Sequence, residues 1–156
     1  RLMHPSYEVK REYMARIHGE VDEAMIKRLT DGVILEDGIA KFQTVKAQHA
    51  RTPDERGGSN RWFRVILAEG RTREVRRLWE SQDVEVNRLK RISYGPIELP
   101  SIVRRSEYIE LDPKQVISLF RAVALKPPRF SEKMVYKDIR ERKEKKLRAR
   151  GDTSKR

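Results

Sequence analysis

Alternation of apolar and charged residues is the feature that most constrains the fold of this sequence. It runs through residues 7–17, 39–50 and 84–92. Successive side chains of a strand point to opposite faces, so a period of two is typical of a strand with one face buried. The sequence therefore predicts three long, half-buried strands.

Shorter elements lie between these strands. Asp22 and Asp112 have the chemistry of helix N-caps, and Gly32 suits a helix end that needs a positive φ. The predicted helices are 23–30, one that begins near 73 with Val75, Leu78 and Trp79 on its apolar stripe, and 113–125; further strands are predicted at 62–67, 97–99 and 106–111. Strands outnumber helices, so we predict an α+β fold with a mixed, mainly antiparallel sheet and flanking helices.

Charge is distributed unevenly along the 156 residues. The chain holds 36 basic and 24 acidic residues, a net charge of +12. Residues 126–156 contain 13 basic and 5 acidic residues, or +8, and few apolar ones. We therefore predict one folded body over 1–125 and a basic tail over 126–156. A chain this basic is expected to bind a polyanion, of which nucleic acid is the commonest.

Composition also excludes several classes of protein. The chain has no cysteine, and its three histidines, His4, His18 and His49, show no metal-ligand spacing. No nucleotide-binding loop, metal-binding helix or serine elbow is present. No apolar run approaches the roughly 18 residues of a membrane span. We expect a cytoplasmic monomer that needs neither metal nor cofactor.

An arginine-rich run follows the predicted strand 62–67. Residues 69–79 read Glu-Gly-Arg-Thr-Arg-Glu-Val-Arg-Arg-Leu-Trp, with four arginines at 71, 73, 76 and 77. Guanidinium groups bind phosphates through paired hydrogen bonds, and a glycine before a helix lets a ligand approach the backbone. The same run also fits a solvated basic face paired with Glu69 and Glu74. Composition alone leaves both interpretations open.

Tyrosines and tryptophans offer candidates for contact with a nucleobase. Tyr13 lies on the first predicted strand, where its ring has the chemistry to stack on an extruded base. A tyrosine in this position is also common as a core residue. Tyr94 and Trp62 share this ambiguity, and we assign both to the core.

Several motifs resemble one enzyme family. These are Arg1-Leu-Met-His-Pro-Ser-Tyr-Glu-Val9, Lys10-Arg-Glu-Tyr13, Leu35-Glu-Asp-Gly38, the arginine-rich run through Glu80, and Arg91-Ile-Ser-Tyr-Gly-Pro-Ile97. In order and spacing they resemble the small-subunit-type branch of bacterial ribosomal RNA pseudouridine synthases. The resemblance runs from Arg1 to about Leu125 and shifts the arginine-rich run toward RNA contact.

The resemblance implies a reaction that needs no cofactor. Such enzymes detach uracil from its ribose, rotate it and rejoin it through C5. Their essential aspartate follows Gly-Arg-Leu, and none of the eight aspartates of this chain does. We therefore expect that residue, and an RNA-binding domain, in an upstream segment, and we expect this chain alone to be inactive.

The resemblance assigns roles to particular residues. Tyr13 matches the tyrosine that stacks on the target base, and Arg76 matches the arginine that pairs with the essential aspartate. The further predicted RNA contacts are Lys10, Arg11, Arg71, Arg73 and Arg77, and the predicted apolar wall of the uracil pocket is Leu89 and Ile92. The implied partner is ribosomal RNA, with 23S RNA the expected target.

A second hypothesis comes from a different class of protein. A non-catalytic RNA-binding module of the ribosome, or of its assembly, would share the charge and the arginine-rich run. It would not depend on Tyr13 beyond a modest contribution to affinity.

Overall fold

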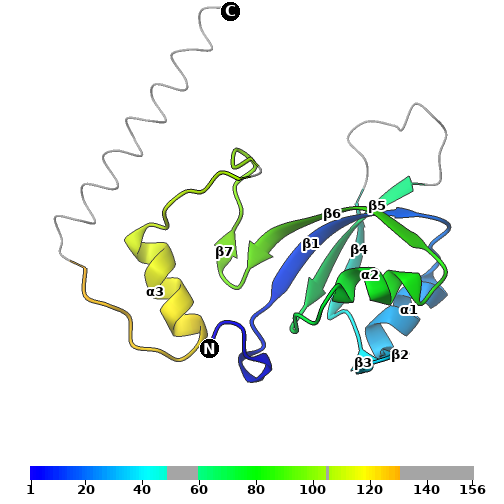
Figure 1. Cartoon of the computed structure of the whole chain (residues 1–156), viewed down its shortest axis with the longest axis horizontal. Coiled ribbons are helices and arrows are strands. Elements are labelled where there is room, and N and C mark those ends of the chain that lie inside the picture. Colours follow the sequence, from blue (N-terminus) through cyan, green and yellow to red (C-terminus); the bar gives the residue numbers. More distant parts are fainter. Residues whose placement is uncertain (49–59, 105, 131–156) are drawn as a thin grey trace, which may run out of the picture. The chain divides into compact units, whose positions relative to one another are not determined.

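The computed structural model describes residues 1–48, 60–104 and 106–130 (Figure 1). Its contacts divide the chain into two compact units, Arg1–Val103 and a second that begins at Arg104. The boundary predicted between residues 125 and 126 lies at a different position from this division, and it stays a prediction. No helix within the described ranges is long and apolar enough to cross a membrane.

The first unit is built on an antiparallel sheet of five strands in the order β4-β5-β1-β6-β7. Its strands are β1 (Arg11–His18), β4 (Thr44–Gln48), β5 (Asn60–Leu67), β6 (Glu85–Tyr94) and β7 (Ile97–Glu98), with α1 (Glu23–Asp31) after β1 and α2 (Glu74–Glu80) after β5. The order β1-α1-β4-β5-α2-β6 is a split β-α-β arrangement. The predicted α+β class with a mainly antiparallel sheet is confirmed.

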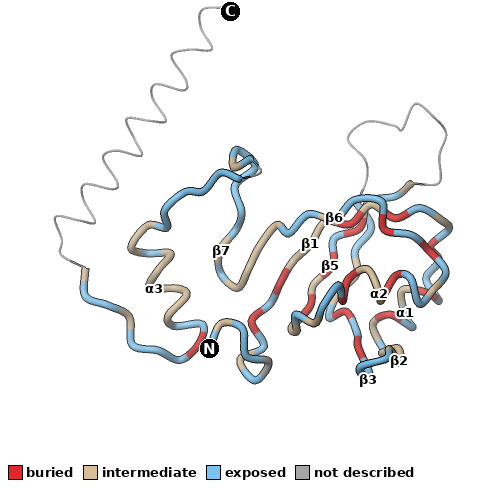
Figure 2. The backbone as a smooth tube through the Cα atoms, viewed as in Figure 1, coloured by how far each residue is buried: buried red, intermediate tan, exposed pale blue. Residues whose placement is uncertain are grey.

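Both helices contribute to one core on a single face of the sheet. Ala15 and Ile17 of β1 are fully buried there, whereas the alternating residues Met14 and Arg16 are only half-buried, and Figure 2 shows buried segments along β1. Trp79 of α2 is completely buried in this core, with its ring centroid 5.2 Å from that of Phe63. The alternation predicted from the sequence is therefore realised, with β1 beginning at Arg11 after a 3-10 turn at Pro5–Tyr7.

Helix α1 begins and ends as its sequence predicts. The Asp22 carboxylate accepts a hydrogen bond of 2.6 Å from the backbone N–H of Met25, which satisfies one of the free donors of the first turn. Gly32 follows the helix at φ 126°, and a Cβ there would lie 3.1 Å from Ile39.

The prediction of one continuous strand over residues 39–50 is wrong. A separate hairpin, β2 (Val33–Leu35) with β3 (Gly38–Ala40), ends before β4 begins at Thr44. Phe42 interrupts the strand because its side chain turns into the core, where it is 1% exposed, and its N–H donates to the Leu29 carbonyl. The apolar side chain that suggested a continuous strand therefore causes the break. Residues 49 and 50 lie outside the described residues.

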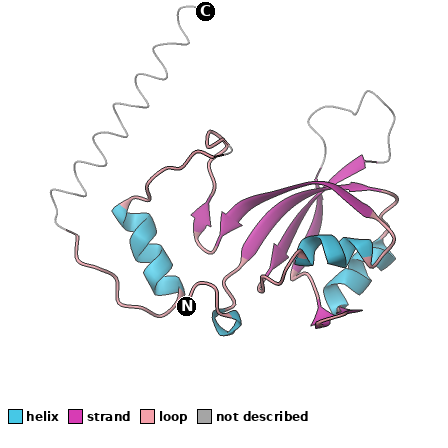
Figure 3. Cartoon of the chain, viewed as in Figure 1, coloured by secondary structure: helices cyan, strands magenta, loops and turns pink. Residues whose placement is uncertain are grey.

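The second unit contains α3 (Pro113–Ala122), which begins with a complete capping box between Asp112 and Gln115. The strand predicted at 106–111 is wrong, because this segment is an exposed loop (Figure 3). Tyr108 there is 87% exposed, and no strand pairs with the segment. Most of the predicted basic tail, 131–156, lies outside the described residues.

Candidate functional site

A pocket of about 540 Å³ opens where β1 and β6 meet the segment that leads into α2. Four arginines line it, together with two tyrosines, one carboxylate and several apolar side chains. The lining residues are Met3, Arg11, Tyr13, Leu67, Gly70, Arg71, Arg73, Glu74, Val75, Leu89, Arg91 and Tyr94. The pocket is therefore cationic and partly aromatic.

Two irregularities in β6 decide which of its side chains reach the pocket. The pairing of β1 with β6 shifts between Glu12 and Tyr13, and again between Arg16 and Ile17. Each shift inserts one extra residue in β6, as in a β-bulge. As a result Arg91 lies opposite Tyr13 and Leu89 lies opposite Ala15, on the face of β1 that carries the pocket.

Tyr13 is held by an alternating stack of guanidinium groups and aromatic rings. The guanidinium carbon of Arg91 lies 5.3 Å from the centroid of the Tyr13 ring and 5.4 Å from that of Tyr94. The guanidinium carbon of Arg11 also lies 5.2 Å from the centroid of the Tyr94 ring. Arg91 also donates a hydrogen bond of 3.0 Å to the Tyr13 hydroxyl. Cation–π contacts of this kind stabilise both partners and fix the ring planes.

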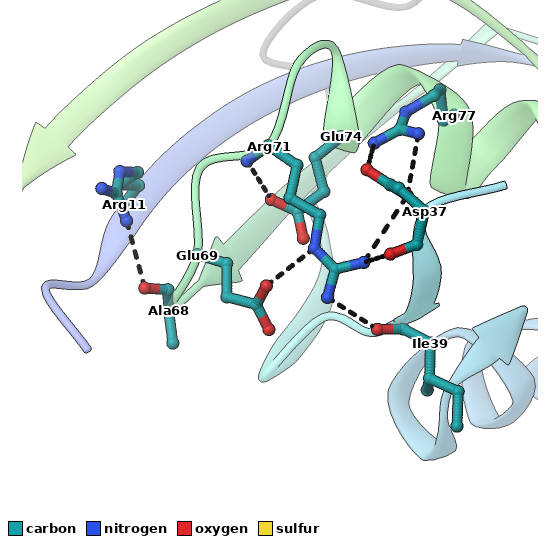
Figure 4. Close-up of polar contacts among 8 residues, drawn as sticks. All are labelled: Arg11, Asp37, Ile39, Ala68, Glu69, Arg71, Glu74 and Arg77. Carbon is teal, nitrogen blue, oxygen red and sulfur yellow. Dashed lines mark hydrogen bonds and ion pairs between the residues drawn. The ribbon is translucent and has the colours of Figure 1, made fainter. Parts of the chain in front are cut away.

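Arg11 is a buried cation at the floor of the pocket. Its side chain is 6% exposed and donates to the carbonyls of Val9 and Ala68, each at 3.1 Å (Figure 4). Among the described residues no carboxylate pairs with it. A Cβ at Gly70 would lie 2.9 Å from Nε of Arg11, so this glycine is required by the packing of the guanidinium.

Asp37, in the turn of the β2–β3 hairpin, is held by two arginines of the arginine-rich run (Figure 4). Arg77 donates to both carboxylate oxygens, at 2.9 and 2.8 Å, and this hydrogen bonding lowers the pKa of Asp37. Arg71 donates to the carbonyls of Asp37 and Ile39 at 3.2 and 2.9 Å, and to the Glu69 carboxylate at 2.8 Å. Both arginines therefore tie the hairpin to the pocket wall.

Glu74 is the carboxylate of the pocket lining. It is 3% exposed and accepts a hydrogen bond of 3.0 Å from the backbone N–H of Arg71. Burial raises its pKa, because removal from water disfavours the ionised carboxylate. Glu74 is the first residue of α2, so this hydrogen bond joins the start of the helix to the segment before it.

The remaining arginines of the run point in different directions. Arg73 precedes α2 in a left-handed conformation (φ 52°), is exposed, and lines the pocket. Arg76 is half-buried and donates to the Val86 carbonyl of β6. Of these arginines, Arg76 and Arg77 lie within α2, whereas Arg73 is the residue before its first turn.

The sequence of the chain is similar to that of curated proteins called ribosomal large subunit pseudouridine synthase B. The chain is 50% identical over 127 residues to ribosomal large subunit pseudouridine synthase B of Pseudomonas aeruginosa, across 81% of this chain and 32% of that protein. It is 47% identical over 148 residues to the protein of the same name from Escherichia coli K12, across 95% of this chain and 49% of that protein. Over most of its length, the chain is similar to pseudouridine synthases.

A solved structure supports the fold described above. A crystal structure of a pseudouridylate synthase superposes with a TM-score of 0.62 at 21% identity, covering 76% of this chain and 48% of that one. No family model matches the sequence. The chain spans about half the length, or less, of the curated relatives it matches.

The pocket gathers five of the nine residues predicted for the site of a pseudouridine synthase. Arg11, Tyr13, Arg71, Arg73 and Leu89 line it, whereas Lys10, Arg76, Arg77 and Ile92 do not. Ile92 is the extra residue of a β6 irregularity, so Arg91 takes the position opposite Tyr13. The roles of all nine residues stay predictions.

Sequence reasoning missed Arg91 and Glu74, and placed Tyr94 in the core. Tyr94 instead lines the pocket, and its hydroxyl donates to the Leu2 carbonyl at 2.7 Å. The Arg91-Ile-Ser-Tyr motif was a usable signal for Arg91 and Tyr94. Among the described residues no cluster of three or more histidine, aspartate or glutamate side chains could hold a metal ion.

Proposed function

We propose that this chain forms one wall of the active site of an enzyme that converts a uridine of large-subunit ribosomal RNA to pseudouridine in the cytoplasm. The observation that carries the proposal is Tyr13, held by Arg91 at the mouth of a cationic pocket. The names of the relatives support the substrate class. In the reaction the N1–C1′ bond breaks, a C5–C1′ bond forms, and the hydrogen on C5 leaves as a proton while N1 gains one.

Uracil is a flat, partly apolar ligand, and the pocket offers matching surfaces. The Tyr13 ring stacks on the extruded base, and Leu67, Val75 and Leu89 supply apolar contacts around it. Arg91 occupies one side of the Tyr13 hydroxyl by donating to its oxygen. The hydroxyl proton is thereby directed away from Arg91, where it serves a proton transfer to the base.

Arg76 serves the carboxylate that attacks or deprotonates the sugar. Its side chain is anchored to the Val86 carbonyl, and it has no carboxylate partner among the described residues. The carboxylate comes from an upstream segment that carries Gly-Arg-Leu-Asp. An adjacent guanidinium keeps such a carboxylate ionised at neutral pH.

The positive charge of the pocket serves RNA. Exposed Arg73 contacts phosphate, and buried Arg11 makes the floor of the pocket electropositive. Arg71 and Arg77 act on RNA through the hairpin they hold, since most of their donors are engaged by Asp37, Glu69 and Ile39.

Release of tritium from ribosomal RNA labelled at C5 of uridine tests the proposal. The chain alone is expected to release none, and the chain joined to an upstream segment with Gly-Arg-Leu-Asp is expected to turn over. In the joined protein, Tyr13→Ala and Arg76→Ala should each lower turnover at least about 100-fold, as loss of a catalytic group commonly does. Arg129→Ala, which removes an exposed arginine distant in sequence from the pocket, is the matched control.

Two outcomes contradict the proposal. Tritium release by the chain alone removes the need for the upstream carboxylate. Equal turnover of the Tyr13→Ala and Arg129→Ala proteins removes Tyr13 from the reaction and favours a non-catalytic RNA-binding module.

A further inference from the structure

The face of the main sheet opposite the pocket carries a second basic surface. Residues of β1 that face the pocket, Arg11 and Tyr13, alternate with residues that face the other way, Met14 and Arg16. The core, α1 and α2 all lie on the pocket's side of β1. The opposite side, called the open face below, is therefore built from the outward residues of β4, β5, β1 and β6.

Cross-strand register arranges the open face in parallel rows, with Glu12 and Glu98 in the flanking row on one side and Glu85 in the flanking row on the other. Between them lie two central rows: the first row is Lys46, Arg64, Met14 and Lys90, and the second row is Gln48, Trp62, Arg16 and Arg88. Each row crosses the four strands β4-β5-β1-β6 in order. Five of these eight side chains are cationic, and none is acidic.

The cations of the open face exceed the carboxylates near them. Lys46, Arg64, Arg88 and Lys90 are exposed. Glu12 pairs with Arg64, with one hydrogen bond of 2.8 Å, and Glu98 of β7 also acts on Arg64. Like charges placed side by side on a sheet destabilise the fold, so this arrangement is costly unless a polyanion neutralises it.

Trp62 adds an aromatic ring to the centre of the second row. It is half-buried, and it lies between Gln48 and Arg16 in the register. The second tryptophan, Trp79, is completely buried in the core. An accessible aromatic ring among cations is the combination that binds single-stranded nucleic acid, in which a base stacks on the ring and phosphates contact the cations.

Strand spacing suits an RNA backbone. Neighbouring strands lie about 4.8 Å apart, so Lys46 on β4 is about 14 Å from Lys90 on β6, three strands away, and Arg88 and Lys90 on the same strand are about 7 Å apart. Alternate and consecutive phosphates of an extended single strand are separated by similar distances. We propose that the open face binds a single-stranded segment of RNA, with phosphates at Lys46, Arg88 and Lys90 and a base stacked on Trp62. This surface is separate from the uridine pocket and does not rest on the proposed reaction.

Tryptophan fluorescence tests the proposal at its own site. An oligoadenylate of about 12 nucleotides is the probe, because it contains no uridine for the pocket to recognise. Its binding is expected to quench emission from Trp62, since Trp79 is shielded in the core. In the Trp62→Phe protein the quenching disappears, and affinity measured by anisotropy of a labelled probe falls at least about fivefold.

Charge removal gives a second, independent measurement. The variant Lys46→Ala/Arg88→Ala/Lys90→Ala should reduce the slope of log affinity against log salt by about 2, since each lost phosphate contact on a single strand contributes about 0.7. The control Lys27→Ala/Lys41→Ala/Lys114→Ala removes the same charge from exposed positions outside the open face and should leave the slope nearly unchanged.

The proposal is overturned if oligoadenylate leaves Trp62 emission unchanged, or if both triple variants lose the same slope. Polyglutamate that binds as tightly as oligoadenylate, with no effect of Trp62→Phe, assigns the surface to an acidic protein and also overturns it. Tritium release from ribosomal RNA reports on the pocket instead, so failure of either proposal is seen without the other.

Discussion

Arg11 is a buried cation whose hydrogen-bond partners are carbonyl oxygens rather than carboxylates. Its packing against Gly70 explains why a glycine stands between β5 and α2, where the sequence alone suggested close approach of a ligand. Burial of an unpaired guanidinium costs free energy, and such costs are tolerated at functional sites. An anion bound in the pocket is therefore expected to offset the cost of burying Arg11.

Replacement of Gly70 by alanine is expected to destabilise the protein. The added Cβ would lie 2.9 Å from Nε of Arg11, and overpacking of this kind costs about 1 to 3 kcal/mol. The cost should fall by at least about 0.5 kcal/mol in an Arg11→Met background, where the guanidinium is absent. Urea denaturation of the four proteins measures this coupling. An equal cost in both backgrounds would show that Arg11 is not the neighbour that requires glycine.

The β2–β3 hairpin shows how an element too small to be stable alone is kept in place. Its strands have three residues each, and two-stranded sheets are marginal in water. Ile34 and Ile39 are directly opposite each other and exposed, at 85% and 67%, so they contribute little burial. The hairpin is held by the packing of Val33, Leu35 and Ala40 against the core, and through Asp37 by Arg71 and Arg77 of the pocket segment.

Loss of the Asp37 charge is expected to weaken this attachment in a pH-dependent way. Hydrogen bonds from Arg77 hold the pKa of Asp37 below its ordinary value of 3.8, so the stabilisation is present above that pH and is lost on acidification. Asp37→Asn should therefore unfold at lower urea than the unmodified protein at pH 7, and the difference should shrink as the pH falls below 3.8.

Asp31→Asn is the matched control for this change. Asp31 makes an exposed ion pair with Lys27 within α1, and such pairs contribute little. A similar pH-dependent loss in both variants would contradict a special role for Asp37.

Positive charge is distributed unevenly along the whole molecule. Of the net charge of +12, residues 126–156 carry +8. The pocket and the open face hold the most concentrated cations of the described part. RNA binding is therefore expected to depend on salt through more than one surface.

Deletion of 126–156 tests the contribution of the basic end. Affinity for ribosomal RNA should become less dependent on salt. The slope of log affinity against log salt concentration should be smaller than that of the full chain, because 13 basic residues are removed. An unchanged slope would mean that this segment does not contact RNA. Trp62 quenching by oligoadenylate should persist in the shortened chain, since Trp62 belongs to the sheet.

The sequence by itself determined the features that depend on neighbours a few residues apart. The Asp22 and Asp112 caps, the apolar stripe of α2 and the half-buried alternation of β1 all follow from local spacing. Each is satisfied by contacts within one or two turns, or by one buried face, so composition and period suffice to predict it.

Only the tertiary structure decided which distant residues meet. The two β6 irregularities bring Arg91 opposite Tyr13, the burial of Phe42 divides the predicted long strand, and Asp37 engages Arg77 forty residues away. The segment 106–111 was predicted to be a strand but pairs with no strand of the described residues. Register, strand partners and ion pairs depend on how the whole chain competes for the same surfaces, because a single inserted residue reverses the face of every side chain that follows it.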